Sequence, residues 1–231
     1  MDGGCDALKA SIPFYANGEG KKANMAQMLY QGHGSYRLTL NDGTVVYVDP
    51  FAGKGYDEPA DLILVTHEHF DHNQVDKMPH ASGCSIIRAA DVHPTPDEYL
   101  TVESHGVRVT AVQAYNKNHS VDACVGLLLE VDGVTFYASG DTSMTDDMRS
   151  GKLADAGIDY ATFPGDGFYN MDVAEASECA KLVSARHSIP MHLVPMNDPT
   201  DASQLFSRER AEAFQGPGRV IVAPGETLDL V

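Results

Sequence analysis

Paired cysteines, long apolar runs and basic residues are all scarce in this chain of 231 residues. The four cysteines lie far apart and form no C-x-x-C pair, so we expect neither a disulfide framework nor a thiolate zinc site. No run approaches the ~18 apolar residues of a membrane-spanning helix, and the first residues lack a secretory signal pattern. These absences predict a cytoplasmic protein without a membrane segment.

The charge balance is strongly acidic, with 16 Lys and Arg against 33 Asp and Glu and a net charge of −17. Such a charge repels phosphate backbones and anionic membrane surfaces, which disfavours a nucleic-acid or membrane partner. The chain also has neither a Gly-rich phosphate-binding loop nor an arginine cluster. We therefore expect a small-molecule substrate, and the composition leaves a homo-oligomer open.

The order of the predicted elements indicates one α/β domain. Hairpins centred on Asp42-Gly43 and Asp132-Gly133 come early, and helices alternating with strands follow. Such an order predicts packed sheets with helices on the outside, and no linker separates two cores. The later elements are expected as helices within residues 145–157, 171–187 and 201–214 and as strands at 158–164 and 219–224.

The amino-terminal part of the chain differs from the rest in composition. Residues 1–24 are polar and Gly-rich and end in two lysines. We interpret them as an N-terminal arm that precedes a domain of residues 25–231.

The stretch THEHFDH, residues 66–72, places three histidines, a glutamate and an aspartate directly after the apolar run DLILV. In an extended segment His67 and His69 project to the same side, and Asp71 and His72 then follow on a turn. Imidazole and carboxylate ligands without thiolate suit zinc, manganese or iron. The alternative is a polar loop rich in histidine, but the pattern H-x-H-x-D-H after a buried strand favours a metal site.

One short segment rarely supplies a whole metal site, so further ligands are expected from distant loops. His119, Asp141 and His192 are candidates because each lies at or near the end of a predicted strand. Taken singly, either histidine could pair with backbone or water, and Asp141 could close a turn or cap a helix. The cluster at residues 66–72 favours reading all three as ligands.

These motifs, in this order, resemble the metallo-β-lactamase fold superfamily. The match runs over about residues 26 to 227 and comprises THEHFDH, a later His, G-D-T after a hairpin and a final His after a strand. YQGHGSYRL, VDPF, FPGDGFYNMDVAEASECAKL and the closing APGET are similar to the ascorbate-phosphate-lactonase-like branch of small metal-dependent hydrolases. The resemblance implies a single-domain αβ/βα four-layer sandwich.

The resemblance also implies two divalent metal ions, zinc in the first place and manganese as the alternative. His67, His69 and His119 would hold one ion. Asp71, His72 and His192 would hold the other, with Asp141 bridging the two. Glu68 occupies a variable position and is not expected to be a ligand. The superfamily branch that performs oxygen chemistry with two irons typically has Glu where this chain has His69, which counts against an oxidoreductase.

The expected function is a hydrolase that uses a hydroxide held between two metals to cleave a small ester, lactone or phosphorylated metabolite. Asp71 and Asp141 are the ligands counted as catalytic, Asp141 because it would bridge the ions and Asp71 because it could also orient the hydroxide. Asp166 in FPGDGFYN is a candidate for delivering a proton, although it could be a turn residue between glycines. His33 in QGHGS is expected near the site because both neighbouring glycines allow close approach. The alternatives are a phosphodiesterase for a small or lipid-linked substrate, and a non-hydrolytic metal-binding or di-iron redox protein.

Overall fold

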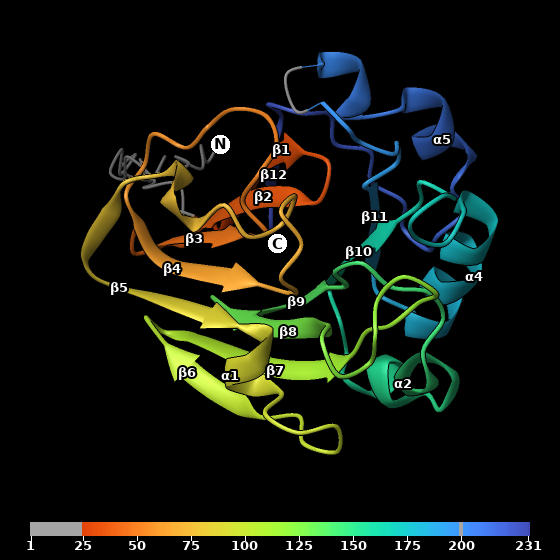
Figure 1. Cartoon of the computed structure of the whole chain (residues 1–231), viewed down its shortest axis with the longest axis horizontal. Coiled ribbons are helices and arrows are strands. Elements are labelled where there is room, and N and C mark those ends of the chain that lie inside the picture. Colours follow the sequence, from red (N-terminus) through yellow and green to blue (C-terminus); the bar gives the residue numbers. More distant parts are fainter. Residues whose placement is uncertain (1–24, 199–200) are drawn as a thin grey trace, which may run out of the picture.

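The computed structural model describes residues 25–198 and 201–231, so the predicted N-terminal arm, residues 1–24, lies outside the described residues (Figure 1). Two six-stranded mixed sheets form the centre of the fold. The first has β1 (Gln27–Gly32), β2 (Ser35–Thr39), β3 (Val45–Val48), β4 (Ala60–Val65), β5 (His80–Arg88) and β12 (Thr227–Asp229), in the order β12-β1-β2-β3-β4-β5. The second has β6 (Thr101–Ser104), β7 (Val107–Gln113), β8 (Val125–Val131), β9 (Val134–Ala138), β10 (Tyr160–Pro164) and β11 (His187–Met191), in the order β11-β10-β9-β8-β7-β6.

The two sheets pack face to face through alternating apolar side chains. Leu38 and Leu62 of the first sheet and Leu127 and Leu129 of the second are buried in one cluster. Ring contacts cross between the sheets as well, since Tyr36 of β2 lies 5.5 Å from Phe136 of β9, centroid to centroid. Period-two burial of this kind is what a sheet with one face on the core requires.

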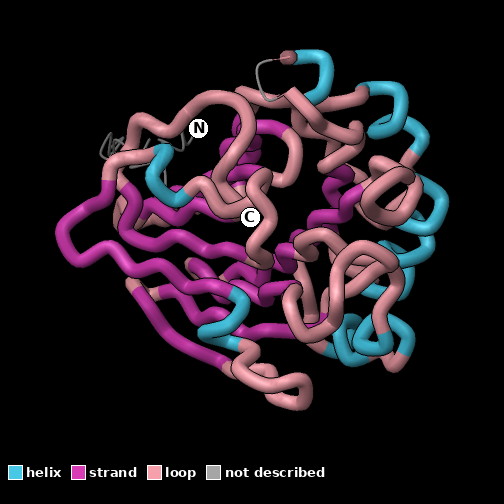
Figure 2. The backbone as a smooth tube through the Cα atoms, in the orientation of Figure 1, coloured by secondary structure: helices cyan, strands magenta, loops and turns pink. Residues whose placement is uncertain are grey.

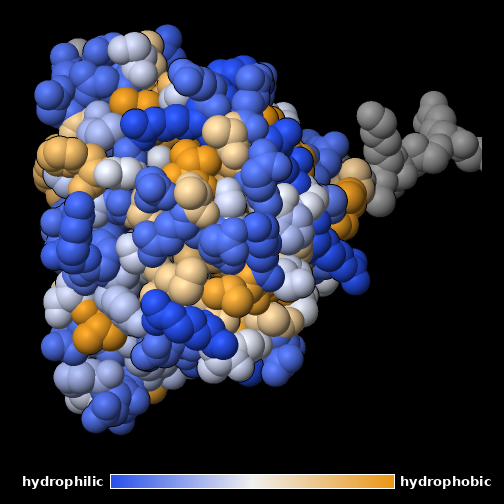
Figure 3. Space-filling model, turned by 90° about the vertical axis from the view of Figure 1, so that its right-hand side faces the viewer, coloured by the Kyte–Doolittle hydropathy of each residue, from blue (hydrophilic) through white to orange (hydrophobic). Residues whose placement is uncertain are grey.

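Helices lie outside the sheets, as Figure 2 shows. They are α1 (Ala89–Val92), α2 (Asp146–Arg149), α3 (Lys152–Asp155), α4 (Val173–Val183) and α5 (Arg208–Ala213). The longest, α4, begins at the cap Asp172, whose side chain accepts the Glu175 N–H, and ends at Ser184 in the left-handed region. Its buried face packs on the second sheet, while the molecular face that carries α4 and α5 is mostly hydrophilic (Figure 3).

The outer face of the first sheet is covered by a much shorter layer. Tyr47 and Ile63 on that face pack against Tyr56 from the loop after β3 and Val75 from a single 3-10 turn, Val75–Lys77. With helices on the other side, the predicted α/β sandwich of one domain is confirmed. No helix within the described residues has both the length and the apolar character needed to cross a bilayer.

Two predicted helices differ in extent from the observed ones. The helix within residues 145–157 begins at the expected cap, Thr145, but Gly151 at φ 84° divides it into α2 and α3. The helix within residues 201–214 is reduced to a 3-10 turn, Ala202–Gln204, and to α5, which is capped by Ser207. Sequence periodicity marks these segments correctly as helical but does not reveal the interruptions.

Residues 219–224 form no strand, contrary to the prediction. Their Val220 N–H donates to Ser188 O at 2.9 Å, which is the first bond of a parallel ladder along β11. The second bond of such a pair would run from the N–H of residue 190 to Val220 O, and that residue is Pro190. Because proline has no N–H, the ladder stops there and β11 remains the last strand of its sheet.

Candidate metal centre

The carboxyl ends of five strands meet at one edge of the sandwich and carry the candidate site. β3 and β4 are parallel in the first sheet, and β9, β10 and β11 are parallel in the second. Residues just beyond these ends, together with the loops after β1 and β7, supply all the predicted site residues. Loops at the carboxyl ends of parallel strands are the usual place for ligand sites in such folds.

The structure brings all seven predicted metal ligands together around Asp141. The carboxylate of Asp141 lies 3.5 Å from His72 Nε2, 3.5 Å from His119 Nε2 and 3.4 Å from His192 Nε2. The ring of His67 lies 4.2 Å from that of His72, centroid to centroid. The ligand atoms gather in three overlapping groups that could hold a metal ion: His67, His69 and His119; His33, Asp71, His72 and His192; and Asp49, His67 and His72.

Unpaired ring nitrogens show that this cluster suits cations. Nε2 of His67, His72 and His192 is buried and has no hydrogen-bond partner among the described residues. A buried polar atom left in this way is costly, so such atoms mark a missing partner. The other ring nitrogen, Nδ1, makes a polar contact in three of the candidate ligands: His67 Nδ1 lies 3.0 Å from Thr66 Oγ1, His72 Nδ1 lies 3.0 Å from Asp49 Oδ2, and His119 Nδ1 lies 2.8 Å from Asn116 Oδ1. Metal-binding histidines are oriented in this manner.

Electrostatics in the cluster favour two of the ionisation states that metal binding needs. Burial holds the pKa of His67 well below its usual value, which keeps this ring neutral. Burial alone would raise the pKa of Asp141, but His192, His72 and the other histidines lower it well below the usual range. A neutral imidazole and an ionised carboxylate are the ligating forms. Burial would also lower the pKa of His72, yet Asp141 and Asp49 raise it to about 10, so a cation at Nε2 has to displace a proton.

Asp49 belongs to the site and was not predicted. It follows β3 in VDPF, is buried, and takes a left-handed backbone with φ 46°. Its Oδ1 accepts the Thr66 N–H at 2.8 Å, and its Oδ2 accepts the Thr66 hydroxyl at 2.7 Å. The same Oδ2 lies 3.0 Å from His72 Nδ1. Asp49 thus fixes both the start of THEHFDH and the orientation of one histidine within it.

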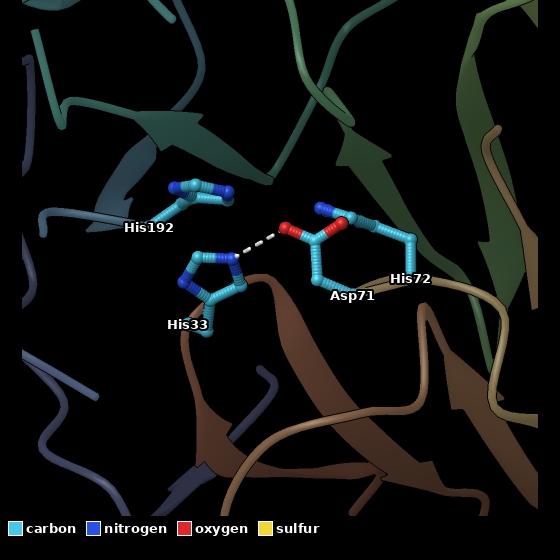
Figure 4. A group of neighbouring side chains, drawn as sticks. All are labelled: His33, Asp71, His72 and His192. Carbon is cyan, nitrogen blue, oxygen red and sulfur yellow. Dashed lines mark hydrogen bonds and ion pairs between the residues drawn. The ribbon is translucent and has the colours of Figure 1, made fainter. Parts of the chain in front are cut away.

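His33 belongs to one of these groups, together with Asp71, His72 and His192 (Figure 4). Its Nε2 lies 3.2 Å from Asp71 Oδ2, and its ring lies beside that of His192, with centroids 3.6 Å apart and the planes tilted by 39°. The backbone N–H of His192 also donates to the backbone oxygen of His33 at 2.9 Å. Gly34 is glycine for a steric reason, since a Cβ there would lie 2.7 Å from His72 Cε1. Burial and His192 lower the pKa of His33 to about 4, so this ring is neutral and holds Asp71 in place.

Asp166 lies behind His192, with Oδ2 at 3.2 Å from His192 Nδ1. Its Oδ1 accepts the N–H groups of Phe168 at 2.7 Å and Tyr169 at 2.6 Å, and its Oδ2 accepts Asn170 Nδ2 at 2.9 Å. Burial alone would raise the pKa of Asp166, but His192 and these donors lower it to about 2. Both oxygens of Asp166 accept hydrogen bonds, and one of them also lies against His192. This arrangement indicates that Asp166 orients His192, whereas the sequence predicted that it delivers a proton.

Arg210 of α5 links the segment that carries Asp166 to the segment that carries His192. Its Nη1 donates to the backbone oxygens of Asp166 and Leu193, the latter at 2.9 Å. We expect Arg210→Gln to weaken metal binding about tenfold, because the loops of Asp166 and His192 lose their common tie. Chelator competition with a chromogenic dye measures this affinity. Arg208→Gln, at an exposed position of the same helix, is the control, and equal effects of both substitutions would contradict the assignment.

A cavity of about 460 Å³ opens directly over the cluster. Its walls include His69, Asp71, His119 and Asp141, and also Phe70, Asn118, Tyr169 and Met196. A second hollow of about 560 Å³ lies between the hairpins at residues 103–108 and 130–135 and contains none of the cluster residues. The first cavity therefore gives a substrate access to the candidate ligands, and the second does not contact them.

Comparison with known proteins defines the class of this fold and site. Residues 27–192 match the family model of the beta-lactamase superfamily domain, so the chain belongs to that superfamily. A UPF0173 metal-dependent hydrolase of Nitratidesulfovibrio vulgaris is 33% identical over 231 residues, covering 88% of this chain and 95% of that protein. Within the superfamily, the protein is therefore a member of the UPF0173 metal-dependent hydrolases. The superfamily resemblance seen in the sequence is confirmed.

Solved structures show the same fold with different chemistry. The crystal structure of a proposed metal-dependent hydrolase from Parabacteroides distasonis is 26% identical, with a TM-score of 0.66 and coverage of 87% of this chain and 93% of that one. CmlA, a diiron beta-hydroxylase from Streptomyces venezuelae, is 14% identical with a TM-score of 0.60, covering 89% of this chain and 54% of that one. The second likeness concerns the fold alone, so fold by itself does not decide between hydrolysis and oxygen chemistry.

Proposed function

We propose that the protein is a dinuclear metal-dependent hydrolase of small esters or lactones. The observation that carries this proposal is that two of the groups share no residue, and that Asp141 lies 3.5 Å from a histidine of each, His119 of one and His72 of the other. His67, His69 and His119 would hold one ion, and Asp71, His72 and His192 the other, with Asp141 shared. Imidazole and carboxylate donors favour zinc, and manganese is the alternative.

When bound, two divalent ions lower the pKa of an attacking water and polarise the carbonyl oxygen that it attacks. The chain's own residues supply position and electrostatics. Asp71 lies at the cavity wall, and His33 holds its carboxylate. Burial alone would raise the pKa of Asp71, but His33 and His72 hold it well below its usual value, so Asp71 is an ionised acceptor that orients the attacking water. Asp49 and Asp166 orient His72 and His192 from behind.

We further place the protein near the ascorbate-phosphate-lactonase-like branch. Support comes from the two segments that suggested the branch, QGHGS and FPGDGFYN. His33 of the first lies 3.2 Å from Asp71, and Asp166 of the second lies 3.2 Å from His192. Two segments that contain none of the seven predicted ligands therefore contact those ligands directly.

Metal removal and reconstitution tests the proposal. We expect the chelated protein to lose hydrolysis of lactones and p-nitrophenyl esters, and two equivalents of zinc or manganese to restore it. Elemental analysis gives the stoichiometry, and spectrophotometric assays give the rates. The same panel includes thioesters and bis(p-nitrophenyl) phosphate, so that a phosphodiesterase would be recognised.

Two results would contradict the hydrolase. One is iron as the resident metal with oxygen-dependent turnover, which would indicate a redox enzyme. The other is metal-loaded protein that cleaves no substrate of the panel, which would indicate a binding role. Occupancy of a single ion per chain at full activity would reject the dinuclear site but leave the hydrolase intact.

A further inference from the structure

Exposed aromatic side chains stand beside the cavity over the metal cluster. Phe70 has 62% of its surface exposed, although it lies between the ligand candidates His69 and Asp71. Its ring meets the buried Phe51 edge-on at 5.6 Å, centroid to centroid. Phe51 in turn belongs to a small buried cluster with Ala52 and Met196. Phe70 is therefore supported from beneath and presents its outer face to solvent.

A second aromatic wall of the cavity comes from the loop after β10, where Tyr169 lines it. Tyr169 is 41% exposed, and its neighbour Phe168 is 61% exposed, with their rings edge-on at 4.7 Å. The backbone of this wall is held on both sides, because the Tyr169 N–H donates to Asp166 at 2.6 Å and Tyr169 O accepts Asn118 Nδ2 at 2.6 Å. Large apolar side chains held rigidly at the mouth of a cavity usually contact a ligand.

The charged residues around the cavity favour a ligand without an anionic substituent. Its charged wall residues, apart from histidine, are Glu68, Asp71 and Asp141, and no lysine or arginine lines it within the described residues. Glu68 forms an ion pair with Arg88 at 2.8 Å, so the nearby arginine already has an acidic partner. A phosphate or carboxylate that extended beyond the metals would meet no lysine or arginine of the described cavity wall that could pair with it.

We propose that this cavity binds the apolar group of an uncharged lactone or ester, with Phe70 and Tyr169 as the residues that determine specificity. The inference rests on the proposed function and narrows its substrate class to uncharged esters and lactones that carry an apolar group. The apolar group lies between the two aromatic walls, while the reacting carbonyl faces Asp141 and its neighbours.

Three lactones that differ in one substituent test the inference. They are γ-decanolactone with an alkyl chain, γ-butyrolactone without one and γ-butyrolactone carrying a carboxylate. With metal-loaded wild type we expect kcat/KM to be highest for γ-decanolactone and lowest for the carboxylate. Phe70→Ala and Tyr169→Ala should each lower kcat/KM for γ-decanolactone by about tenfold, chiefly through KM, and leave γ-butyrolactone within about twofold.

Matched variants and a binding measurement separate the outcomes. Phe70→Leu should retain most of the alkyl preference, and Leu182→Ala, at an exposed apolar position of α4, should change nothing. Saturation-transfer NMR on metal-free protein reports binding of γ-decanolactone without turnover, and Phe70→Ala should weaken that signal.

A preference for the carboxylated lactone, or an equal loss for both neutral lactones in Phe70→Ala and Tyr169→Ala, would overturn the inference while hydrolysis itself stood. If the metal-loaded protein hydrolysed no lactone or ester, the proposed function would fail. The saturation-transfer signal would then decide alone whether the aromatic walls bind an apolar group, and its absence in wild type would reject the inference.

Discussion

Replacing Asp141 with alanine is expected to lower kcat/KM of the metal-loaded protein by at least about 10³-fold, or about 4 kcal/mol in activation free energy. The physical reason is that its carboxylate lies within 3.5 Å of His72, His119 and His192 and is the only predicted ligand between the two groups. Metal stoichiometry, measured by elemental analysis after dialysis, should fall below two per chain.

Asp155→Ala is the matched control, because Asp155 is an exposed aspartate on α3 and lies away from the cluster. It should keep both wild-type activity and metal content. Should Asp141→Ala retain two metals and wild-type activity, the shared-ligand role would be wrong. Circular dichroism of the metal-free variants shows whether a loss reflects the site or the fold.

Asp49→Asn is expected to weaken metal binding about 10- to 100-fold and to lower the free energy of unfolding by about 2–4 kcal/mol. Asp49 accepts two hydrogen bonds from Thr66 and lies 3.0 Å from His72 Nδ1, all in a buried environment. An amide keeps the size of the side chain, but its NH₂ group faces donors. Chelator competition and urea unfolding measure the two effects separately.

Asp132→Asn is the control for the effect of an Asp-to-Asn change at a residue with a left-handed backbone conformation. Asp132 has φ 49°, close to the φ 46° of Asp49, and is exposed in the turn between β8 and β9. It should change metal affinity by less than about twofold. If both variants destabilised the protein equally and left metal affinity alone, Asp49 would be a structural residue of the loop and not a support of His72.

Part of the candidate site can be predicted from local patterns in the amino-acid sequence. The run His67 to His72 carries four ionisable groups in one short segment after an apolar strand, which is visible without any tertiary information. His119, Asp141 and His192 were predicted from their places after strands, and the fold brings them to one edge because those strand ends coincide. The resemblance to the superfamily supplied their division between two ions, which the geometry accommodates.

Residues whose roles depend on distant partners could not be read in this way. Asp49 before a proline has the pattern of a turn residue, and its contacts with Thr66 arise only because β3 and β4 pair in parallel. Arg210 looks like any charged residue of an amphipathic helix until α5 packs beside the loop of Asp166. The expected strand at residues 219–224 failed for a related reason, since Pro190 in its neighbour withholds the bond that the strand needs.

Asp166 has a consequence for redesigning this enzyme. One of its oxygens fixes the backbone of the Tyr169 wall, and the other lies against His192. Changes of length or sequence at residues 167–170, made to admit other substrates, will therefore disturb a candidate metal ligand at the same time. The Phe70 ring rests on Phe51, and Phe51 in turn lies edge-on to His33 with ring centroids 6.0 Å apart. A substitution of the Phe70 side chain leaves the hydrogen bonds of Asp166 in place, so selectivity is better altered there than at residues 167–170.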